Sequence, residues 1–592
     1  MISASEELKE SRNYLISSLF AGDETETFQE NYTEIIDQYF RKNLQESKTG
    51  QSLFRDKKPF ALVAVGGYGR MELCLHSDID ILFLFQAVIP PRAKDLIEEF
   101  LFPLWDLGLD IGHGIRTIKD CIALSRDDFE VLTSIMDARF IGGDSQLFLA
   151  LMERLKKKVI SKKGIALRRW LEDCDRIRMN TYGDASHLLE PNLKEGIGGL
   201  RDYHHILWLG RVFFDLRIPR DMEYMGKLSH SEYRELRNQL TFIWLVRNHL
   251  HHLSGRRNDR LGFEYQEKIA QNIGFQDQDD FLSVEQFMGK LHACMASIKS
   301  LYRSFIVSHL PKRQGPIKNI QSEYISSDLH LYRGEINFHS ATAIISNPFL
   351  LIDIFKQSSL LGRPLSMEAR RLVREFIYLV DDQFRKSEEA VDRFFAMMNG
   401  ENTFQALDNM LDTGFLDVFI PEFARIRDRV QFDAYHIFPV GRHTLETVRY
   451  LKDIAVQNDI LLLDIFSDLS NPEPLFLACL LHDIGKVGKG HAQRGIVITR
   501  KILKRFDYDE NKTKDILFLV GNHLLLVETA TRRDLNDEKV VVQCARTIGD
   551  IKRLKMLYLL TWADSKATGP RAWNEWISNL VQELFFKILH IL

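Results

Sequence analysis

The sequence predicts an α+β protein that is predominantly helical and contains several domains. The clearest strand-like patterns lie in a stretch that begins at Pro59 and ends near residue 117. The remaining sequence has helical periodicity, and its C-terminal third is rich in histidine. A chain of 592 residues is also too long for one hydrophobic core, so we expect three or four domains.

A region of mixed strands and helices is predicted over residues 51–160, after an N-terminal helical segment over residues 1–50. FALVAVGGYGR is a β-rich run that ends in a glycine turn, and SDIDILFLF is a strand with an acidic start. A helix over residues 92–108, a strand in LDIGHGIRT and helices over residues 119–155 complete this region.

The rest of the chain is predicted to be helical in three parts. These are residues 161–330, a linker region over residues 331–425 and a final region over residues 426–592. Loops are expected at EPNLKEGIGGLRD, at SGRRNDRLG and at the Pro/Gly/Gln segment 311–316. Residues 315–345 alternate enough to allow a strand pair.

Composition argues against several classes of protein. A net charge of −4 gives no reason to expect nucleic-acid binding by bulk electrostatics. Six cysteines without a CxxC pair predict reduced thiols and a cytoplasmic protein. The N-terminus does not resemble a signal peptide and the apolar runs are too short to span a bilayer, so we expect a soluble protein without a membrane partner. The absence of a GxxxxGK[ST] sequence argues against a P-loop enzyme.

The first candidate site combines a glycine segment with two aspartates. Gly66-Gly67-Tyr68-Gly69-Arg70 comes shortly before Ser77-Asp78-Ile79-Asp80. Residues two apart on a strand face the same side, so Asp78 and Asp80 present two carboxylates to one point. Such oxygens bind Mg²⁺, and two metals would activate an attacking oxygen and stabilise a leaving pyrophosphate. The glycines let backbone N–H groups approach a triphosphate, and Arg70 adds a charged contact.

Neither half of this pattern is specific by itself. A GGxG segment is usually only a turn, and a DxD sequence is common at exposed strand ends. Their combination in the order strand, turn, strand is what predicts a nucleotide site.

The residues GGYGRMELCLHSDIDILFLF resemble the nucleotidyltransferase signature of the bifunctional uridylyltransferase/uridylyl-removing enzymes that modify the nitrogen-regulatory PII protein. That family belongs to the polymerase-β-like superfamily, so the resemblance implies a polymerase-β-like nucleotidyltransferase domain. One departure is Leu75, where the family usually has a proline. The superfamily also has a third carboxylate, for which Asp110 is the first candidate, and Asp106 and Asp137 are alternatives. Asp110 is equally well explained as an exposed strand residue.

Two further segments resemble the same family. EPNLKEGIGGLRD matches an element found beside the transferase domain, which makes Lys194, Arg201 and Asp202 candidate neighbours of the active site. RNHLHHLSGRRNDRLGFEYQ contains His249, His251 and His252, but no carboxylate lies at helical ligand spacing, so we expect packing or surface roles for them. The candidate nucleotide-binding residues are therefore Gly66, Gly67, Gly69, Arg70, Ser77, Lys194 and Arg201.

The second candidate site is a series of histidines and aspartates in the C-terminal third. Its members are His443, the doublet His482-Asp483, His491, His523 and Asp564. Imidazole and carboxylate together suit Zn²⁺, Mn²⁺, Fe or Mg²⁺, and the absence of cysteine argues against a structural zinc site. A metal at the doublet would turn a water into a nucleophile for phosphodiester cleavage, and Lys486 could contact a phosphate or neutralise developing charge.

The order H…HD…H…H…D resembles the HD phosphohydrolase superfamily, and it is more specific than an isolated histidine, which is more often a packing residue. His443, His482, Asp483 and Asp564 match the core metal ligands, and His491 and His523 match positions that allow a second metal. YHIFPVGRHTLETVRYL and YLLTWADSKATGPRAWNEW resemble the uridylyl-removing domain in particular. The resemblance therefore implies an all-α HD domain over residues 426–592.

Taken together, the resemblance implies a reversible switch. One site, with Mg²⁺, would transfer UMP from UTP to a tyrosine of PII, and Asp78, Asp80 and Asp110 are its candidate catalytic residues. The HD site, with Mn²⁺ or another divalent metal, would hydrolyse the tyrosyl phosphodiester, with Lys486 as a candidate catalytic residue. Family members usually continue into two ACT domains that sense glutamine, whereas this sequence stops shortly after the HD region, so we do not expect glutamine sensing within it.

Three alternatives remain open from the sequence. The tRNA CCA-adding enzymes also combine a polymerase-β-like transferase with an HD domain, but no Lys/Arg-rich stretch offers an RNA-binding face. A PII-binding scaffold with decayed sites is a second reading, against which the intact Asp78, Asp80, His482 and Asp483 argue. A transferase for another nucleotide is a third, because these motifs do not identify the base.

Overall fold

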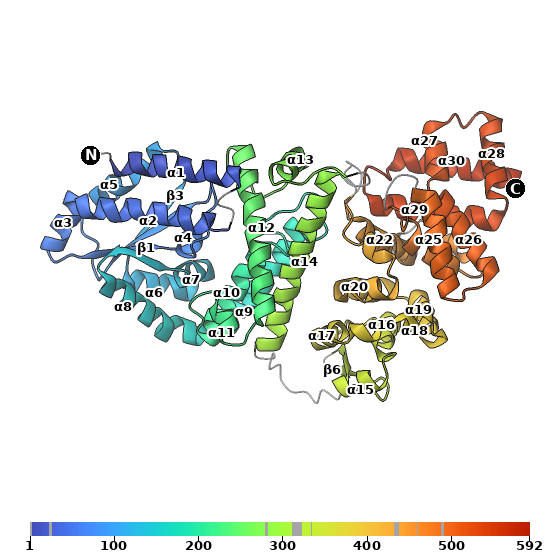
Figure 1. The fold of residues 1–592 in the computed structure, drawn as a ribbon, viewed down its shortest axis with the longest axis horizontal. Coiled ribbons are helices and arrows are strands. Elements are labelled where there is room, and N and C mark those ends of the chain that lie inside the picture. The colour runs from blue at the N-terminus through green and yellow to red at the C-terminus, as the bar shows by residue number, and fades with distance from the viewer. Residues whose placement is uncertain are drawn as a thin grey trace. The chain divides into compact units, whose positions relative to one another are not determined.

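The computed structural model describes most of the chain (Figure 1). The described residues are 3–22, 26–278, 282–310, 323–332, 334–430, 437–457, 459–486 and 491–592. The predicted loop 311–316 lies outside them, as do residues 431–436 and 487–490 of the HD motifs. No described helix is long and apolar enough to cross a membrane.

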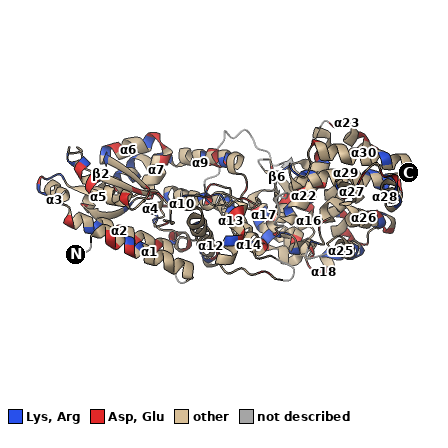
Figure 2. Ribbon diagram, turned by 90° about the horizontal axis from the view of Figure 1, so that it is seen from above, with Lys and Arg blue, Asp and Glu red and all other residues tan. Residues whose placement is uncertain are grey.

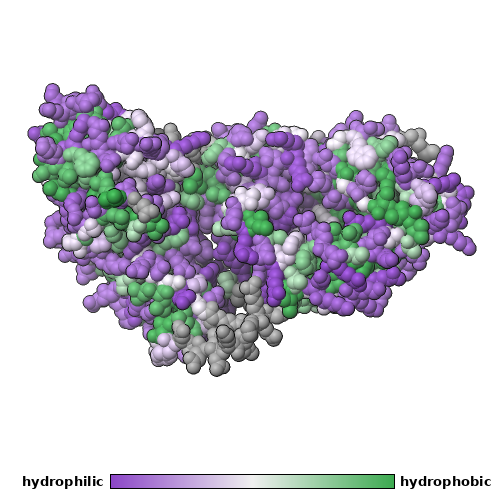
Figure 3. All heavy atoms as spheres, turned by 180° about the vertical axis from the view of Figure 1, so that it is seen from behind, coloured by the Kyte–Doolittle hydropathy of each residue, from purple (hydrophilic) through white to green (hydrophobic). Residues whose placement is uncertain are grey.

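The chain divides into two compact units. The N-terminal unit consists of Met1–Ser186, Glu190–Phe275 and Ala293–Leu310, and the C-terminal unit consists of His187–Leu189, Gln276–His292 and Pro311–Leu592. The five ranges predicted from the sequence are finer than this division and stay a prediction. Hydrophilic side chains cover most of the face seen in Figure 3, and apolar side chains lie in separate patches between them.

The N-terminal unit is built on a four-stranded mixed sheet. Its strands are β1 (Phe60–Ala64), β2 (Ile79–Phe85), β3 (Ile111–Thr117) and β4 (Arg139–Gly143), in the order β3-β2-β1-β4. β1 is antiparallel to β2 and to β4, and β2 is parallel to β3. The two faces of β2 differ: Ile81 and Phe83 enter a hydrophobic core, so Asp80, which alternates with them, faces the opposite side.

Helices cover both faces of this sheet (Figure 1). α1 (Ala4–Ala21), α2 (Phe28–Glu46), α3 (Lys48–Arg55) and α5 (Ala93–Asp106) lie on the side of that core, and α6 (Ile118–Asp127), α7 (Phe129–Met136) and α8 (Ser145–Leu155) lie on the other side. Tyr32, Phe40 and Phe100 are fully enclosed in the core. The side that faces α7 is the side on which Asp80 lies, so this helix layer frames the first candidate site.

The predicted fold class is confirmed, and two local predictions are wrong. The glycine segment forms a short helix, α4 (Gly66–Gly69), rather than a turn. β4 lies within residues 119–155, for which only helices were predicted. RFIGG contains two glycines and has weak strand propensity, but pairing with β1 stabilises it as a strand. A strand of this kind depends on its partner rather than on its own sequence.

Long helices make up the remainder of the N-terminal unit. They are α9 (Ser161–Tyr182), α10 (Leu200–Phe214), α11 (Asp221–Tyr224), α12 (His230–Ser254), α13 (Phe263–Asn272) and the C-terminal part of α14 (Ser283–His309). A π-helical turn over Lys156–Ile160 joins α8 to α9. α10 is buried along most of its length, so its polar side chains face the interior of the unit rather than solvent.

The C-terminal unit is almost entirely helical. A small antiparallel sheet of β5 (Glu323–Tyr324), β6 (Leu329–Tyr332) and β7 (Glu335–Phe338) replaces the strand pair allowed by the sequence. The helices that follow are α15 (Ala341–Ser346), α16 (Leu350–Leu361), α17 (Met367–Glu375), α18 (Asp382–Lys386), α19 (Glu388–Asn399), α20 (Thr403–Thr413), α21 (Phe415–Phe419), α22 (Val440–Lys452), α23 (Ile460–Ser467), α24 (Glu473–Leu481), α25 (His491–Arg505), α26 (Glu510–Asn522), α27 (Leu525–Arg532), α28 (Glu538–Ile548), α29 (Ile551–Thr568) and α30 (Glu575–Ile591). One continuous hydrophobic core runs through them.

Two candidate active sites

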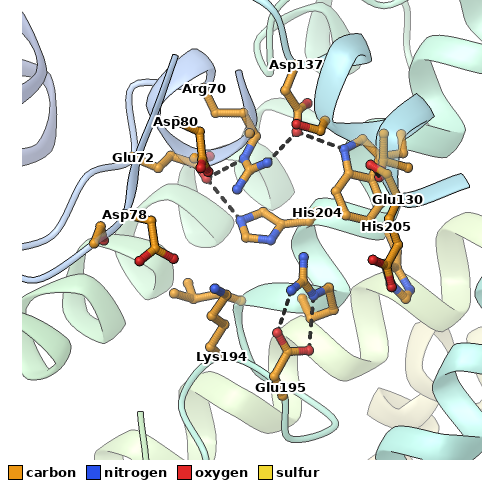
Figure 4. A pocket seen from close by; sticks show the side chains of 18 of the residues that line it. Arg70, Glu72, Asp78, Asp80, Glu130, Asp137, Lys194, Glu195, His204 and His205 are labelled. Atoms are coloured by element: carbon orange, nitrogen blue, oxygen red, sulfur yellow. Dashed lines mark hydrogen bonds and ion pairs between the residues drawn. The ribbon is translucent and has the colours of Figure 1, made fainter. Parts of the chain in front are cut away.

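The N-terminal unit contains a cavity of about 630 Å³ around the paired aspartates. Its lining comes from α4, the start of β2, α7, α9, α10, α12 and the loop that precedes α10. Figure 4 shows acidic, basic and imidazole side chains gathered in this cavity. The predicted residues Gly66, Gly67, Arg70, Ser77, Asp78, Asp80, Lys194 and Arg201 all line it.

Two glycines make room for the Asp80 carboxylate. A Cβ at Gly112 would lie 2.1 Å from Asp80 Oδ1, and a Cβ at Gly66 would lie 3.3 Å from Oδ2. Gly66 also has a φ of 58°, which favours glycine. Burial raises the pKa of Asp80, and the neighbouring Asp78 carboxylate raises it further. A cation between the two carboxylates would relieve this repulsion, so the pair fits a divalent metal.

Arg70 lies in the cavity but is engaged by carboxylates of the protein itself. Its Nε donates to Glu72 Oε2 at 2.7 Å, and its Nη1 pairs with Asp137. Asp137 is fully buried and also pairs with Arg211 and accepts from Trp208 Nε1 at 3.0 Å. Asp137, an alternative for the third carboxylate, therefore has its oxygens occupied by side chains of the unit.

Three other predicted residues do not line the cavity, and two of them are in contact with other parts of the protein. Asp110 is exposed just before β3 and is not part of the cavity lining, although its carbonyl accepts from Ile79 N at 2.9 Å. Gly69 packs against the backbone, because a Cβ there would lie 2.2 Å from the Asp137 carbonyl oxygen. Asp202 is fully buried and binds Arg178 Nη2 at 2.7 Å. Asp110 as the third carboxylate and Gly69 as a nucleotide contact therefore stay predictions without support from this geometry.

Cationic side chains also line the cavity. Burial lowers the pKa of Lys194 to about 8, and the nearby Arg247 and Arg201 guanidinium groups lower it too. Arg201 is held by Glu195, with 3.1 Å between its Nε and Oε2. Arg257, which the sequence analysis did not single out, places Nη1 2.5 Å from Asp78 Oδ2. Paired carboxylates together with the long basic side chains of lysine and arginine suit a metal-bound polyphosphate.

Packing or surface roles were predicted for the histidines of α12, and two of them have packing roles. His249 and His251 are buried, and His249 packs against Phe20 with ring centroids 4.8 Å apart. His251 Nδ1 accepts from the backbone N–H of His76 at 3.2 Å. Among the described residues these histidines form no group with the spacing of metal ligands.

The C-terminal unit brings the predicted HD residues together from five helices. His443 lies in α22, His482 and Asp483 directly follow α24, and His491 begins α25. His523 directly follows α26, and Asp564 lies in α29. All of these side chains except His491 are buried almost completely, and His491 is half-buried.

The nitrogen and oxygen atoms converge on one centre. His443 Nε2 lies 2.9 Å from Asp564 Oδ1 and 3.2 Å from His482 Nε2. His482 Nε2 lies 3.3 Å from Asp483 Oδ2, and His523 Nε2 lies 3.7 Å from Asp483 Oδ1. Asp483 belongs to two sets of ligand atoms that each lie within 4.8 Å, one with His443 and His482 and one with His491 and His523. Asp483 is therefore placed to be shared by two metal ions.

Hydrogen bonds orient two of the imidazoles. His482 Nδ1 lies 2.9 Å from the Cys479 carbonyl oxygen, and His523 Nδ1 lies 2.9 Å from the Val520 carbonyl oxygen. A carbonyl only accepts, so each Nδ1 carries a hydrogen and each Nε2 is the nitrogen that would present its lone pair to a bound metal. This is the arrangement by which backbone carbonyls orient metal-binding histidines.

The electrostatics of this centre also fit a cation. Burial alone would lower the pKa of His482, but the carboxylates of Asp483 and Asp564 raise it to about 10. Asp483 is 1% exposed, and neither of its oxygens makes a hydrogen bond within the described residues. Lys486 Nζ lies 2.8 Å from Asp483 Oδ2, so its predicted contact with a substrate phosphate would compete with this ion pair. The chemistry and burial of the set therefore fit one or two divalent metal ions.

Models of three protein families match parts of this chain. The model of a nucleotidyltransferase, DUF294, matches residues 10–108, the model of GlnD PII-uridylyltransferase matches residues 168–306, and the HD domain model matches residues 440–556.

Several similar curated proteins are named bifunctional uridylyltransferase/uridylyl-removing enzyme. The protein of Caulobacter vibrioides is 34% identical over 562 residues, which cover 90% of this chain and 59% of that protein. The protein of Methylococcus capsulatus is 34% identical, with 89% of this chain and 61% of that protein covered, and the protein of Pseudomonas putida is 33% identical, with 92% and 61% covered. The chain thus spans about three-fifths of the length of these relatives. With matches to a nucleotidyltransferase model and an HD domain model in the regions of the two candidate sites, the chain is similar to the bifunctional uridylyltransferase/uridylyl-removing enzymes.

Proposed function

We propose that this chain transfers UMP from UTP to a tyrosine of the PII protein and hydrolyses the uridylyl-tyrosine bond at a separate HD site, thereby controlling nitrogen assimilation. One observation carries the proposal. A cavity with paired carboxylates and several cations lies in the N-terminal unit, and a buried histidine and aspartate cluster lies in the C-terminal unit of the same chain. The first suits polyphosphate transfer and the second suits phosphodiester hydrolysis.

The transferase site would bind UTP with Mg²⁺ held by Asp78 and Asp80. Mg²⁺, when bound, would neutralise charge on the triphosphate and on the leaving pyrophosphate. Lys194 and Arg257 would bind the phosphate oxygens, and the glycine at position 67 would let the backbone approach them. The acceptor hydroxyl would enter through the same cavity.

The HD site would hold Mn²⁺ or another divalent metal with His443, His482, Asp483 and Asp564, and a second ion with His491 and His523. A divalent metal, when bound, would supply an activated water for hydrolysis. Lys486 would neutralise charge near Asp483 and orient the phosphodiester. Separate sites make physical sense because transfer must exclude water, whereas hydrolysis consumes it.

Other features support PII rather than RNA as the partner and the cytoplasm as the location. In Figure 2 basic and acidic residues are interspersed along the helices of both units, and the net charge of the sequence is −4. All six cysteines lie among the described residues and none of them forms a disulfide bond, as suits a reducing compartment. The complete and buried HD ligand set argues against a scaffold with decayed sites.

The experiment is an intact-mass measurement of PII after incubation with the full chain, UTP and Mg²⁺. We expect a UMP-sized mass increase, which reverses after UTP is removed and Mn²⁺ is added. An increase only with ATP, GTP or CTP would overturn the choice of nucleotide. No increase with any of the four, from a folded preparation, would overturn PII as the acceptor.

A further inference from the structure

We propose that His204 is the base that accepts the proton of the acceptor hydroxyl during nucleotidyl transfer, and that Glu72 orients it. The proposal rests on the transferase function proposed above and names a catalytic residue for it. Both side chains line the cavity that contains Asp78 and Asp80. His204 lies in α10 and is 3% exposed, and Glu72 follows α4 and is 8% exposed.

The hydrogen bond between the two residues determines which nitrogen of His204 carries the hydrogen. His204 Nε2 lies 3.0 Å from Glu72 Oε2, and the same oxygen accepts from Arg70 Nε at 2.7 Å. A carboxylate beside a guanidinium offers only lone pairs, so the hydrogen of this bond belongs to His204 Nε2. The other ring nitrogen, Nδ1, therefore presents a lone pair.

That lone pair has no donor within the described residues. His204 Nδ1 is buried and makes no hydrogen bond there. Figure 4 shows the imidazole between Glu72 on one side and Lys194 on the other, inside the cavity. An unsatisfied buried acceptor costs free energy, so a ligand that fills the cavity is expected to bring a hydrogen to this nitrogen. Of the two groups that react, the α-phosphate and the acceptor hydroxyl, the hydroxyl is the one that has a hydrogen to give.

The charges around His204 keep it in the form that a base requires. Burial moves the pKa of His204 well below its usual value, and the Arg70 and Arg201 guanidinium groups lower it further. Lys194 also lowers this pKa, whereas Asp137 raises it. The imidazole is therefore neutral before the reaction. A lowered pKa also weakens it as a base, so the Glu72 carboxylate is needed to stabilise the proton that it accepts.

His204 shares its electrostatic environment with the metal-binding aspartates. Arg70 and Lys194 act on the pKa of Asp80 as well as on that of His204. The predicted third carboxylate, Asp110, is not part of the cavity lining, and the oxygens of Asp137 are engaged by Arg70, Arg211 and Trp208. Glu130 also lines the cavity but is exposed. Among these candidates, His204 is the buried side chain with an acceptor atom, Nδ1, that has no donor within the described residues. It is therefore the group that we assign to the hydroxyl.

The step balances as follows. His204 Nδ1 takes the proton of the hydroxyl, and the hydroxyl oxygen forms a bond to the α-phosphorus of UTP. The bond from that phosphorus to the bridging oxygen breaks, and pyrophosphate leaves with the electron pair. Glu72 stabilises the imidazolium that forms, as the carboxylate does in a carboxylate–histidine pair, and the proton then passes to solvent.

The test compares His204→Asn, which keeps a hydrogen-bond acceptor but not a base, with Glu72→Gln. The matched control is His249→Asn, a substitution of a buried histidine of α12 outside the cavity lining. Single-turnover transfer is measured from about pH 4 to about pH 9, because a base gives an acid limb in the rate profile and the lowered pKa of His204 places that limb at acid pH. UTP affinity is measured by tryptophan fluorescence, since Trp208 and Trp244 line the cavity, and thermal melting monitors folding.

We expect His204→Asn to lower the transfer rate by about 10²-fold or more, to remove the acid limb and to leave the Kd for UTP within about threefold. Glu72→Gln should lower the transfer rate less than His204→Asn does, and it should shift the acid limb of the pH profile. His249→Asn should change neither the transfer rate nor the acid limb. A folded His204→Asn protein that retains the rate within about threefold, or that loses UTP affinity instead, overturns the proposal. A loss of rate with Glu130→Gln but not with His204→Asn overturns it in favour of the exposed carboxylate.

A failure of the proposed function gives a different result. If the unmodified chain transfers no nucleotide to PII, the acceptor is wrong, and the same variants are compared with water as the acceptor by the release of UMP from UTP. Asp78→Asn with Asp80→Asn shows which part of that release belongs to this cavity. The same loss with His204→Asn supports the base, and an unchanged release overturns it.

Discussion

Arg257 Nη1 lies 2.5 Å from Asp78 Oδ2, although 179 residues separate the two in the chain. Asp78 is a predicted metal ligand at the start of β2, and Arg257 lies in the loop after α12. Both side chains are partly exposed, so the ion pair is screened by water and is easily exchanged. A guanidinium in this place can release the carboxylate to a metal ion and bind a phosphate instead.

Arg257→Gln is therefore expected to raise the KM for UTP by about tenfold, the equivalent of one charge-assisted hydrogen bond. Arg256→Gln is the control, because Arg256 is the exposed neighbour in the same loop and is not part of the cavity lining. Steady-state transfer at a fixed Mg²⁺ concentration measures both. An equal effect of the two substitutions would show a general charge effect rather than a contact made by Arg257.

The lowered pKa of Lys194 predicts a pH dependence of UTP binding. The pKa of Lys194 is lowered to about 8, first by burial and then by Arg247 and Arg201. Without UTP, the Lys194 ammonium group therefore loses its charge as the pH rises through 8. The charged form binds phosphate, so UTP affinity should be high below pH 8 and should fall above it. Lys194→Arg should bind UTP without this decline, and Lys194→Met should bind weakly at every pH. Titrations of tryptophan fluorescence at several pH values would measure this, and an equal decline in Lys194→Arg would assign it to another group.

The two active sites are expected to fail independently. Asp78→Asn with Asp80→Asn should abolish transfer of UMP to PII and leave removal largely intact, because the substitutions lie in the N-terminal unit. His482→Ala with Asp483→Ala should abolish removal and leave transfer largely intact. Intact-mass spectrometry of PII, started from the unmodified and the uridylylated forms, reads both activities. A folded variant that loses both would refute the assignment of independent sites.

Metal content should separate the shared ligand from the others. Asp483 belongs to both ligand sets of the HD cluster, whereas His491 belongs to one. Asp483→Asn should therefore purify with little bound divalent metal, and His491→Ala should keep the ion held by His443 and His482. Elemental analysis after dialysis gives the metal-to-protein ratio. The same ratio in the two variants would argue against a bridging role for Asp483.

A buried network should hold the glycine helix in place. Asp37 is fully buried and accepts from Tyr68 Oη at 2.8 Å and from Arg139 Nη1 at 2.5 Å. Removing one partner of a buried charge pair costs about 3 kcal/mol, so Asp37→Ala should lower the free energy of unfolding by that amount. Tyr68→Phe should cost only about 1 kcal/mol, because Arg139 still pairs with Asp37. Urea denaturation followed by tryptophan fluorescence measures both, and equal losses would contradict this ranking.

Much of the architecture and many of the site residues could be predicted from the sequence alone. The fold class follows from hydrophobic periodicity, and the two-residue spacing of Asp78 and Asp80 places both on one side of β2. The HD residues could be identified because their order matches a known pattern, although a pattern does not show that His443 and Asp564 approach to 2.9 Å. Local spacing is sufficient where the relevant side chains belong to one strand or one helix turn.

Tertiary structure decided the contacts between distant segments. Glu72 and His204 are 132 residues apart, and nothing in either segment predicts that they pair or that Nδ1 is left without a partner. β4 exists because β1 offers it backbone hydrogen bonds, and Asp110 is left outside the cavity lining by the way β3 begins. The physical reason is the same in each case. Periodicity determines which side chains share a face, whereas the packing of whole elements determines which faces meet.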